Sequence, residues 1–319
     1  IIFLEVVNNH TPDKFDMLDA IFLKENGLTI KQYFTYSLIV FACVYNNPLF
    51  TKRNLIDAKI KGYEDYFTEE NIDKYFKLVS INYKNFRSLD EELNINLDPL
   101  DTKNRDNLLK VFPIIETDKN ENGLPYIIPN IVNFIFKGFE GMYWWFDKYF
   151  QLQGKTEDYR NYFGPVFEDY VGLILKDAYG ETEVKPEIKY KKGKFIDWHV
   201  EKDEKVYLFE VKAKQFSLKT LQTGDIELIK KEVREKLLRA VKQVYSRISE
   251  IDSYEELKKF RGKKIIPIII FLDIPLVSAG GYKKIINGDL MSLESEEKYR
   301  GISQFDYHLL NVEELEDYA

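Results

Sequence analysis

Cysteine and histidine are scarce in this sequence. Its 319 residues include one cysteine, Cys43, and three histidines that lie far apart, His10, His199 and His308. Disulfide frameworks need paired cysteines, and zinc sites need clusters of cysteine and histidine ligands. The sequence therefore excludes disulfides within the chain and cysteine- or histidine-based zinc sites, and it favours a reducing, cytoplasmic setting.

Long apolar runs are also missing. The longest, residues 36–45, has about half of the roughly 20 residues that a membrane-spanning helix requires. The basic flank, apolar stretch and cleavage site of a signal peptide are not visible either. We therefore expect no contact with a membrane. The first residue is Ile and not Met, so we expect the chain to be part of a longer protein.

Glycine-rich phosphate-binding loops are a third absence. Neither Gly-x-x-x-x-Gly-Lys-Ser/Thr nor Gly-x-Gly-x-x-Gly occurs in the sequence. The backbone amides of such loops cradle nucleotide phosphates. Their absence disfavours a nucleotide-dependent enzyme.

The composition that remains is ordinary for a globular protein, but the charge is unevenly distributed. Hydrophobic residues make up 45% and charged residues 31% of a chain long enough for two domains, which excludes disorder and low complexity. The net charge of −7 disfavours nucleic acid as a partner. Residues 181–264, however, hold 22 Lys and Arg against 16 Asp and Glu, a local +6, and the remainder carries −13. A basic segment suits a phosphate-bearing ligand, although its lysines could also simply solvate a helix and strand edges.

Residues 1–150 are predicted to form a mainly α-helical domain. Thr29 is suited to cap a helix over 30–45, and Asn130 to cap an aromatic helix that runs to Phe150. The aromatic helix allows two interpretations, a platform for stacking bases or a helix buried between two domains. We expect this half to bind substrate, to sense a signal or to mediate assembly.

Residues 151–319 show a different pattern, in which short strands alternate with helices. Pro165 fits the first turn of a helix that ends at Gly180. The elements expected after this helix are strands over 182–190, 195–201 and 206–213, a charged helix over 225–249, strands over 265–272 and 307–311, and a helix from residue 312. This order predicts an α/β fold in which helices flank a mixed sheet.

Three polar residues within the apolar strands point to a chemistry. Asp197 lies in one predicted strand, and Glu210 and Lys212 lie two residues apart in the next, so that these two side chains share a face. A short hairpin joins the strands and can bring the three groups together. Two carboxylates make an oxygen-rich site suited to Mg²⁺ or Mn²⁺. A lysine beside them can hold an attacking water and offset charge on a phosphoryl group.

This arrangement resembles the PD-(D/E)XK nuclease superfamily, which has the restriction-endonuclease-like fold. The resemblance covers about half of the chain and consists of Asp197, Glu210-Val211-Lys212 and Glu168 on the preceding helix, in the same order of elements. It implies that Asp197 and Glu210 bind Mg²⁺ or Mn²⁺, with help from the Val211 carbonyl. Glu168 would be a further metal ligand or would orient one. Lys212 would position and polarise the nucleophilic water.

Two positions depart from the family pattern. Ile196 stands where a proline often precedes the aspartate. Some RecB-like members carry Gln-x-x-x-Tyr on the helix that follows the motif. Gln243 matches the glutamine here, but Arg247 stands at the tyrosine position. We take Gln243 as an auxiliary catalytic residue and assign no subgroup.

Other polar residues near the motif allow two interpretations each. Lys214 continues the face of Glu210 and Lys212, and it either binds phosphate or is solvated. His199 shares the face of Asp197, and it is either catalytic or an ordinary strand histidine. Lysines that either contact backbone phosphates or are solvated border the hairpin at positions 185, 189, 191, 192 and 194.

The leading hypothesis is a Mg²⁺-dependent nuclease that hydrolyses phosphodiester bonds, most simply as an endonuclease acting on DNA. By the same resemblance we expect a prokaryotic defence or restriction setting. The alternative is a non-catalytic subunit that uses the nuclease fold for binding or assembly, with the acidic remainder and the aromatic helix as interface features. Both hypotheses are compatible with a homo-oligomer or with a partner protein subunit.

Overall fold

The computed structural model describes residues 12–45, 47–58, 60–93, 107–117, 126–213, 216–217, 220, 225–272, 279–293, 299 and 305–318. The chain divides into two compact units, the first ending at Tyr159 and the second beginning at Arg160. The sequence-based boundary lay between residues 150 and 151. Lys214 and His10 lie outside the described residues.

The first unit contains short helices around an aromatic core. Thr29 caps α3 as predicted: its hydroxyl accepts from the Gln32 N–H at 3.1 Å, and the Gln32 side chain accepts from the Thr29 N–H at 2.9 Å. The helices of this unit are α2 (Pro12–Asn26), α3 (Ile30–Val44), α4 (Lys52–Ile56), α5 (Glu69–Val79), α6 (Tyr83–Leu93), α7 (Leu108–Val111), α8 (Ile131–Ile135) and α9 (Gly141–Leu152).

None of the described helices is by itself both long enough and apolar enough to cross a bilayer. Residues 16–26 of α2 meet the requirements only in combination with α3, and the two helices are bent by 70° to each other.

A small sheet in the first unit was not predicted. Its strands are β1 (Leu49–Phe50), β2 (Ser80–Asn82), β3 (Ile114–Glu116) and β4 (Tyr126–Ile127), in the spatial order β1-β4-β3-β2. Only β2 and β3 run parallel. Strands of two or three residues are too short to show alternation in a sequence, so the pairing becomes visible only in three dimensions.

The predicted aromatic helix is present but interrupted. Asn130 caps α8 by accepting from the N–H groups of Val132 and Asn133, and the π-helical turn η3 (Phe136–Glu140) separates α8 from α9. Phe134 and Phe146 are fully buried. Many of the rings pack against other aromatic side chains of the same unit, which supports a structural role for this segment.

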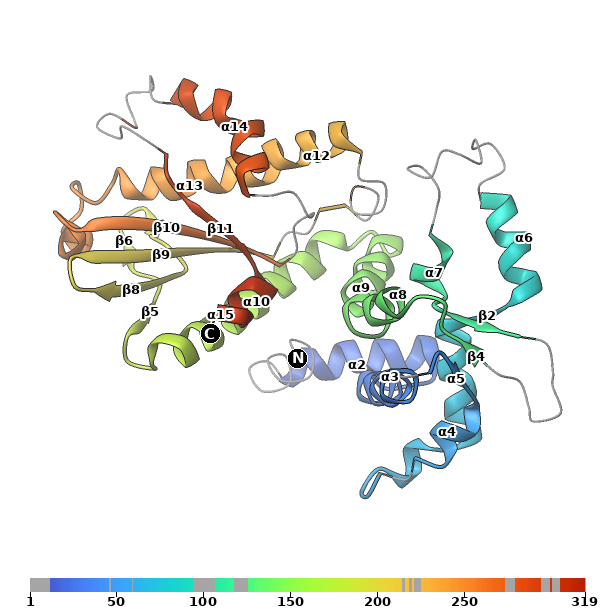
Figure 1. The fold of residues 1–319 in the computed structure, drawn as a ribbon. Helices are drawn as coiled ribbons and strands as arrows, with labels where there is room; N and C mark the ends of the chain where they lie inside the picture. The colour runs from blue at the N-terminus through green and yellow to red at the C-terminus, as the bar shows by residue number, and fades with distance from the viewer. Residues whose placement is uncertain are drawn as a thin grey trace. The chain divides into compact units, whose positions relative to one another are not determined.

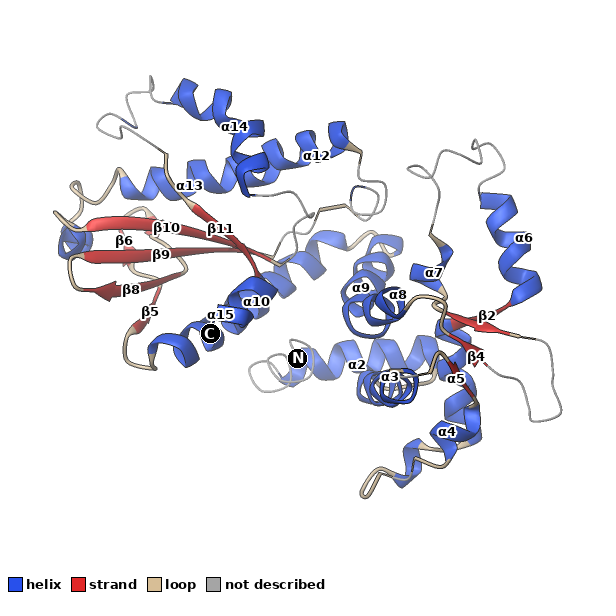
Figure 2. Ribbon diagram, viewed as in Figure 1, coloured by secondary structure: helices blue, strands red, loops and turns tan. Residues whose placement is uncertain are grey.

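The second unit is built on a five-stranded mixed sheet, drawn in red in Figure 2. Its order is β11-β10-β9-β8-β5. The pairs β5–β8 and β8–β9 are antiparallel, whereas β9–β10 and β10–β11 are parallel. The strands are β5 (Val184–Pro186), β8 (Trp198–Lys202), β9 (Lys205–Lys212), β10 (Lys264–Phe271) and β11 (His308–Asn311), with a separate hairpin of β6 (Lys189–Tyr190) and β7 (Gly193–Lys194). A strand is present in each predicted range, but 182–190 is split in two and the strand predicted over 195–201 begins only at Trp198.

Helices cover both faces of this sheet (Figure 1). On one face lies α10 (Thr156–Tyr179), whose Tyr179 contacts Tyr207 and Phe209. On the other face lies the predicted charged helix, which consists of α12 (Ile226–Val233), the π-helical turn η4 (Arg234–Leu238) and α13 (Arg239–Ile248). The remaining helices are α14 (Ala279–Leu293) and α15 (Val312–Tyr318).

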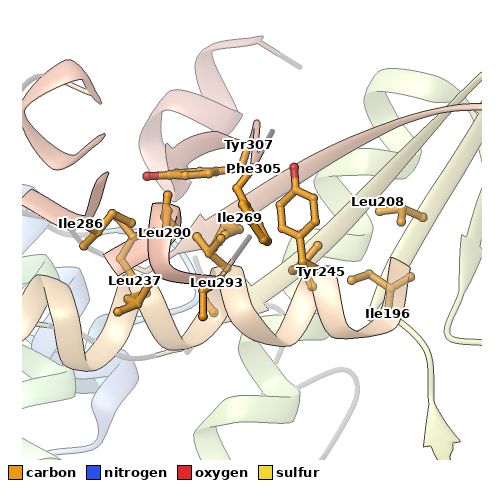
Figure 3. Close-up of a cluster of buried hydrophobic side chains, with 14 of the residues drawn as sticks. Ile196, Leu208, Leu237, Tyr245, Ile269, Ile286, Leu290, Leu293, Phe305 and Tyr307 are labelled. Atoms are coloured by element: carbon orange, nitrogen blue, oxygen red, sulfur yellow. The ribbon is translucent and has the colours of Figure 1, made fainter. Parts of the chain in front are cut away.

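The main hydrophobic core of the second unit lies between the sheet and α12–α14 (Figure 3). Leu208 and Ile269 from the sheet face Leu237, Tyr245 and neighbours on the helices. Burial of such side chains contributes about 1.5–3 kcal/mol each. The chain is therefore a mixed α/β protein whose central strands are buried on both faces, as the apolar runs in β9 and β10 require.

The prediction for the start of α10 was wrong. The helix begins at Thr156, so Pro165 lies inside it and not in its first turn. Proline has no N–H, so one backbone hydrogen bond of the helix is missing at this point. The acidic first turn, with Glu157 and Asp158, favours a helix start at Thr156 and outweighs the signal from the proline.

Candidate active site

Asp197 is held at the point where β8 begins. The sequence predicts that Asp197 lies within a strand. The strand starts at Trp198, so Asp197 lies just before it. Its carboxylate oxygen Oδ2 accepts from the backbone N–H of Val211 at 2.7 Å. The pairing of β8 with β9 ends at Trp198 and Phe209. Beyond this pair, the Asp197 side chain provides the acceptor for the Val211 N–H that a longer β8 would have provided from its backbone.

Glu210 and Lys212 lie at the carboxyl end of β9, with side chains on the same face, as predicted. Glu210 is only 1% exposed because both faces of the sheet are covered. The Lys212 ammonium contacts the Glu210 carboxylate. It also donates to Oε1 of Gln243 on α13 at 3.0 Å. Lys212 thereby joins the strand to the helix, and Gln243 belongs to the site.

Glu168 approaches Asp197 from α10, the helix on the other face of the sheet. The pKa of Glu168 is raised from 4.5 to about 7. Burial is the largest cause, and the negative charge of Asp197 is the next. The structure therefore brings Glu168 within electrostatic reach of Asp197. Within the described part of the chain, no hydrogen bond to its carboxylate is formed.

The buried carboxylates at this end of the sheet destabilise one another's charged forms. Burial raises the pKa of Glu210, and the charge of Asp197 adds to this effect, whereas Lys212 opposes it. Burial likewise raises the pKa of Asp197, against the lowering effects of the Val211 N–H and Lys212. Removing like charges from water without enough compensating positive charge has this consequence. The site therefore favours an additional cation.

The donor atoms fit a hard divalent cation. Among the described residues no three His, Cys, Asp or Glu side chains converge into a preformed metal cage. Mg²⁺ typically uses one or two carboxylates and completes its octahedron with water and substrate phosphate. Asp197 and Glu210 supply the carboxylates. The N–H and C=O of a strand residue point to the same side, so the Val211 carbonyl faces the edge beside Asp197.

His199 does not join this site. It is buried on β8, edge-on to Phe260, with Nε2 2.9 Å from Nζ of Lys259. Burial lowers the pKa of His199 to about 4, and the nearby Lys259 charge contributes to the lowering. Glu201 lies 3.9 Å from the same nitrogen, and Lys185 also contributes to the lowering of the pKa. A neutral, packed imidazole is the ordinary structural state of a strand histidine.

The lysines that border the hairpin have different surroundings. Lys194 pairs with Glu187 at 2.5 Å, and Lys192 pairs with Glu250 at 3.1 Å. All five lysines of the group, including these two, are exposed. Of the group, Lys194 lies close enough to Asp197 and Glu168 to affect their pKa values.

Two residues near the site were not assigned to it from the sequence. The Glu187 carboxylate raises the pKa of both Glu168 and Asp197, and Arg247 lowers the pKa of Glu210. Arg247 lies one helical turn beyond Gln243, so helical periodicity could have placed it. Glu187 lies between two short strands, where no sequence pattern distinguishes it from a surface glutamate.

Comparison of the chain with protein-family models, with curated proteins and with solved structures gives no match. The chemistry of the site is therefore inferred from its own residues.

Proposed function

We propose that the second unit is a metal-dependent nuclease with a restriction-endonuclease-like core, and that it hydrolyses phosphodiester bonds in DNA. The observation that carries the proposal is the contact of Lys212 with both the buried Glu210 and Gln243, near the partly buried Asp197. A solvated surface salt bridge needs neither burial nor a third partner. A lysine held between two acceptors is suited to orienting a nucleophile.

The order of elements supports the same fold. Helix α10 is followed by strands β5, β8 and β9, then by helix α12–α13 and strand β10. The strands β5, β8 and β9 form an antiparallel meander, and β10 joins β9 in parallel after the helical crossover. The polar residues lie at the carboxyl end of β9, and open α/β sheets commonly bind ligands at the carboxyl ends of their strands.

The proposed mechanism divides the work among the named residues. Asp197, Glu210 and the Val211 carbonyl would hold Mg²⁺. The metal, when bound, lowers the pKa of a coordinated water and offsets charge on the phosphoryl group. Lys212 donates a hydrogen bond to the attacking water, and Gln243 fixes the direction in which Lys212 donates. Glu168, on the neighbouring helix, would be a further ligand of the metal or would orient one.

The local charge supports a nucleic acid as the substrate. Residues 181–264, which contain the hairpin and the following helix, carry +6 within a chain of −7. Phosphate contacts from lysine and arginine supply most non-specific affinity for nucleic acid. We assign substrate binding, sensing or assembly to the first unit as part of the same proposal.

The test is cleavage of supercoiled plasmid, linear duplex DNA, single-stranded DNA and RNA by the full chain in Mg²⁺, Mn²⁺ or EDTA. Wild type is compared with Glu210→Gln and with a matched control, Glu204→Gln, whose glutamate is exposed in the turn before β9. We expect metal-dependent cleavage of DNA that Glu210→Gln abolishes and Glu204→Gln retains. Absence of both cleavage and Mn²⁺ binding would favour the non-catalytic assembly subunit instead.

A further inference from the structure

Trp198 joins the strand next to Asp197 to the helix that carries Glu168. Its indole Nε1–H donates to the backbone carbonyl of Glu168 at 3.0 Å. The side chain is largely buried, with the residue 9% exposed. Trp198 directly follows Asp197 in the chain, and its indole is bonded to the backbone of Glu168. This one hydrogen bond therefore links the backbone segments that carry the two acidic residues.

Gly172 is the residue that admits the indole. A methyl group at its α-carbon would lie 2.2 Å from Cζ2 of Trp198, well inside any van der Waals contact. One turn later, Nζ of Lys176 lies 5.8 Å from the centre of the Trp198 ring. Residues 168, 172 and 176 follow one another at four-residue spacing, so one stripe of α10 receives the whole indole.

The helix needs a support of this kind near Glu168. Pro165 lies three residues earlier and removes one hydrogen bond from the helical ladder. Within the described part of the chain, nothing donates to the Glu168 carboxylate. The position of that carboxylate therefore depends on where α10 is held, and Trp198 holds it.

We propose that Trp198 is a positioning residue, which sets the spacing between the Glu168 carboxylate and Asp197 and thereby the affinity of the site for a divalent cation. Gly172 is the second part of this device, since only glycine leaves room for the indole. The inference rests on the proposed function, in which Glu168 assists the metal site.

The test is Mn²⁺ binding to the full chain, followed by electron paramagnetic resonance, so that it does not depend on catalysis. Trp198→Phe keeps a ring but removes the N–H donor. We expect it to weaken Mn²⁺ binding about 10-fold, as loss of a group that orients a ligand does. Glu168→Gln should weaken binding by a similar factor. Because both changes act through one carboxylate, the double variant should bind no more weakly than Glu168→Gln alone.

Glycine variants provide a matched comparison on the same helix. Gly172→Ala should reproduce the effect of Trp198→Phe, whereas Gly164→Ala, at a position where a methyl meets nothing within 4 Å, should leave binding unchanged. If Gly172→Ala fails to fold, the Mn²⁺ affinities of Trp198→Phe, Glu168→Gln and the double variant still test whether Trp198 acts through Glu168.

Three results would overturn the inference. Additive losses, about 100-fold in the double variant, would show that Trp198 acts on general structure and not through Glu168. Unchanged Mn²⁺ affinity in Trp198→Phe would show that it does not position the site. A wild-type chain that neither binds Mn²⁺ nor cleaves DNA would refute the proposed function, and this inference with it.

Discussion

The backbone N–H of Val211 donates to a carboxylate oxygen of Asp197 at 2.7 Å. Val211 lies beyond the part of β9 that pairs with β8, so a side chain takes the place of a backbone acceptor there. This contact fixes Asp197 beside the Val211 carbonyl and near Glu210. Burial raises the pKa of both carboxylates, and the Val211 N–H opposes this effect at Asp197. A bound cation would reduce the repulsion between these carboxylates.

Asp197→Asn tests whether that charge serves function at the expense of stability. An asparagine oxygen can still accept from Val211, but the negative charge is lost. We expect cleavage to fall at least about 100-fold. The melting temperature of the metal-free variant at pH 8 should be equal to or above that of wild type, because one source of repulsion on Glu210 is gone. A fully active variant would remove Asp197 from the site.

Glu168 predicts a pH-dependent stability. Its pKa is raised from an ordinary 4.5 to about 7 on folding, so the folded state binds the proton more tightly than the unfolded state. Its contribution to stability is therefore fully present below pH 4.5 and is lost as the pH rises through 7. Glu168→Gln should stabilise the metal-free chain by about 1 kcal/mol at pH 8, after allowance for partial solvent exposure, and by little at pH 4.5.

Thermal unfolding at the two pH values measures this difference. Asp177→Asn, at an exposed position on the same helix, is the control and should show no comparable gain at pH 8. Destabilisation by Glu168→Gln at pH 8 would mean that the carboxylate is held by favourable contacts, contrary to the present account.

His199 predicts the opposite dependence on pH. Its pKa is lowered from 6.5 to about 4, so the unfolded state binds the proton more tightly. The stability that neutral His199 contributes is present above pH 6.5 and is lost as the pH falls through 4. His199→Phe should make unfolding less sensitive to acid in this range and should leave metal-dependent cleavage within about threefold of wild type. A large loss of cleavage with intact folding would restore His199 as a catalytic candidate.

Gln243 predicts a kinetic effect without a metal effect. Gln243→Leu keeps the bulk but removes the acceptor that fixes Lys212. We expect the maximal rate of cleavage to fall about 10-fold, with Mn²⁺ affinity unchanged, since Gln243 does not reach the metal ligands. Loss of Mn²⁺ binding in this variant would assign Gln243 to the metal site itself.

Much of the site could be predicted from the sequence because strand periodicity is strict. The alternation in 206–213 places Glu210 and Lys212 on one face, and the structure confirms this. The contact between Lys212 and Gln243 needs only that the charged helix packs on that face. Apolar runs likewise sufficed for β9 and β10.

Features that depend on competing local signals were not predictable in this way. Pro165 signals a helix start, but the acidic first turn nine residues earlier prevails. The π-helical turns at 136–140 and 234–238 interrupt helices whose apolar periodicity gives no signal of a break. The Trp198 indole packs against Gly172 on another element. The two residues are far apart in the sequence, so no helix or strand periodicity could have predicted this contact.

The most direct measurement is the rate of Mg²⁺-dependent DNA cleavage by Lys212→Ala beside Lys205→Ala. Both variants remove one lysine from β9, but Lys205 is exposed at the opposite end of the strand. Lys212→Ala should lose at least about 100-fold in rate, and Lys205→Ala should stay near wild type. Equal rates for Lys212→Ala and wild type, or cleavage that persists in EDTA, would contradict the proposed nuclease site.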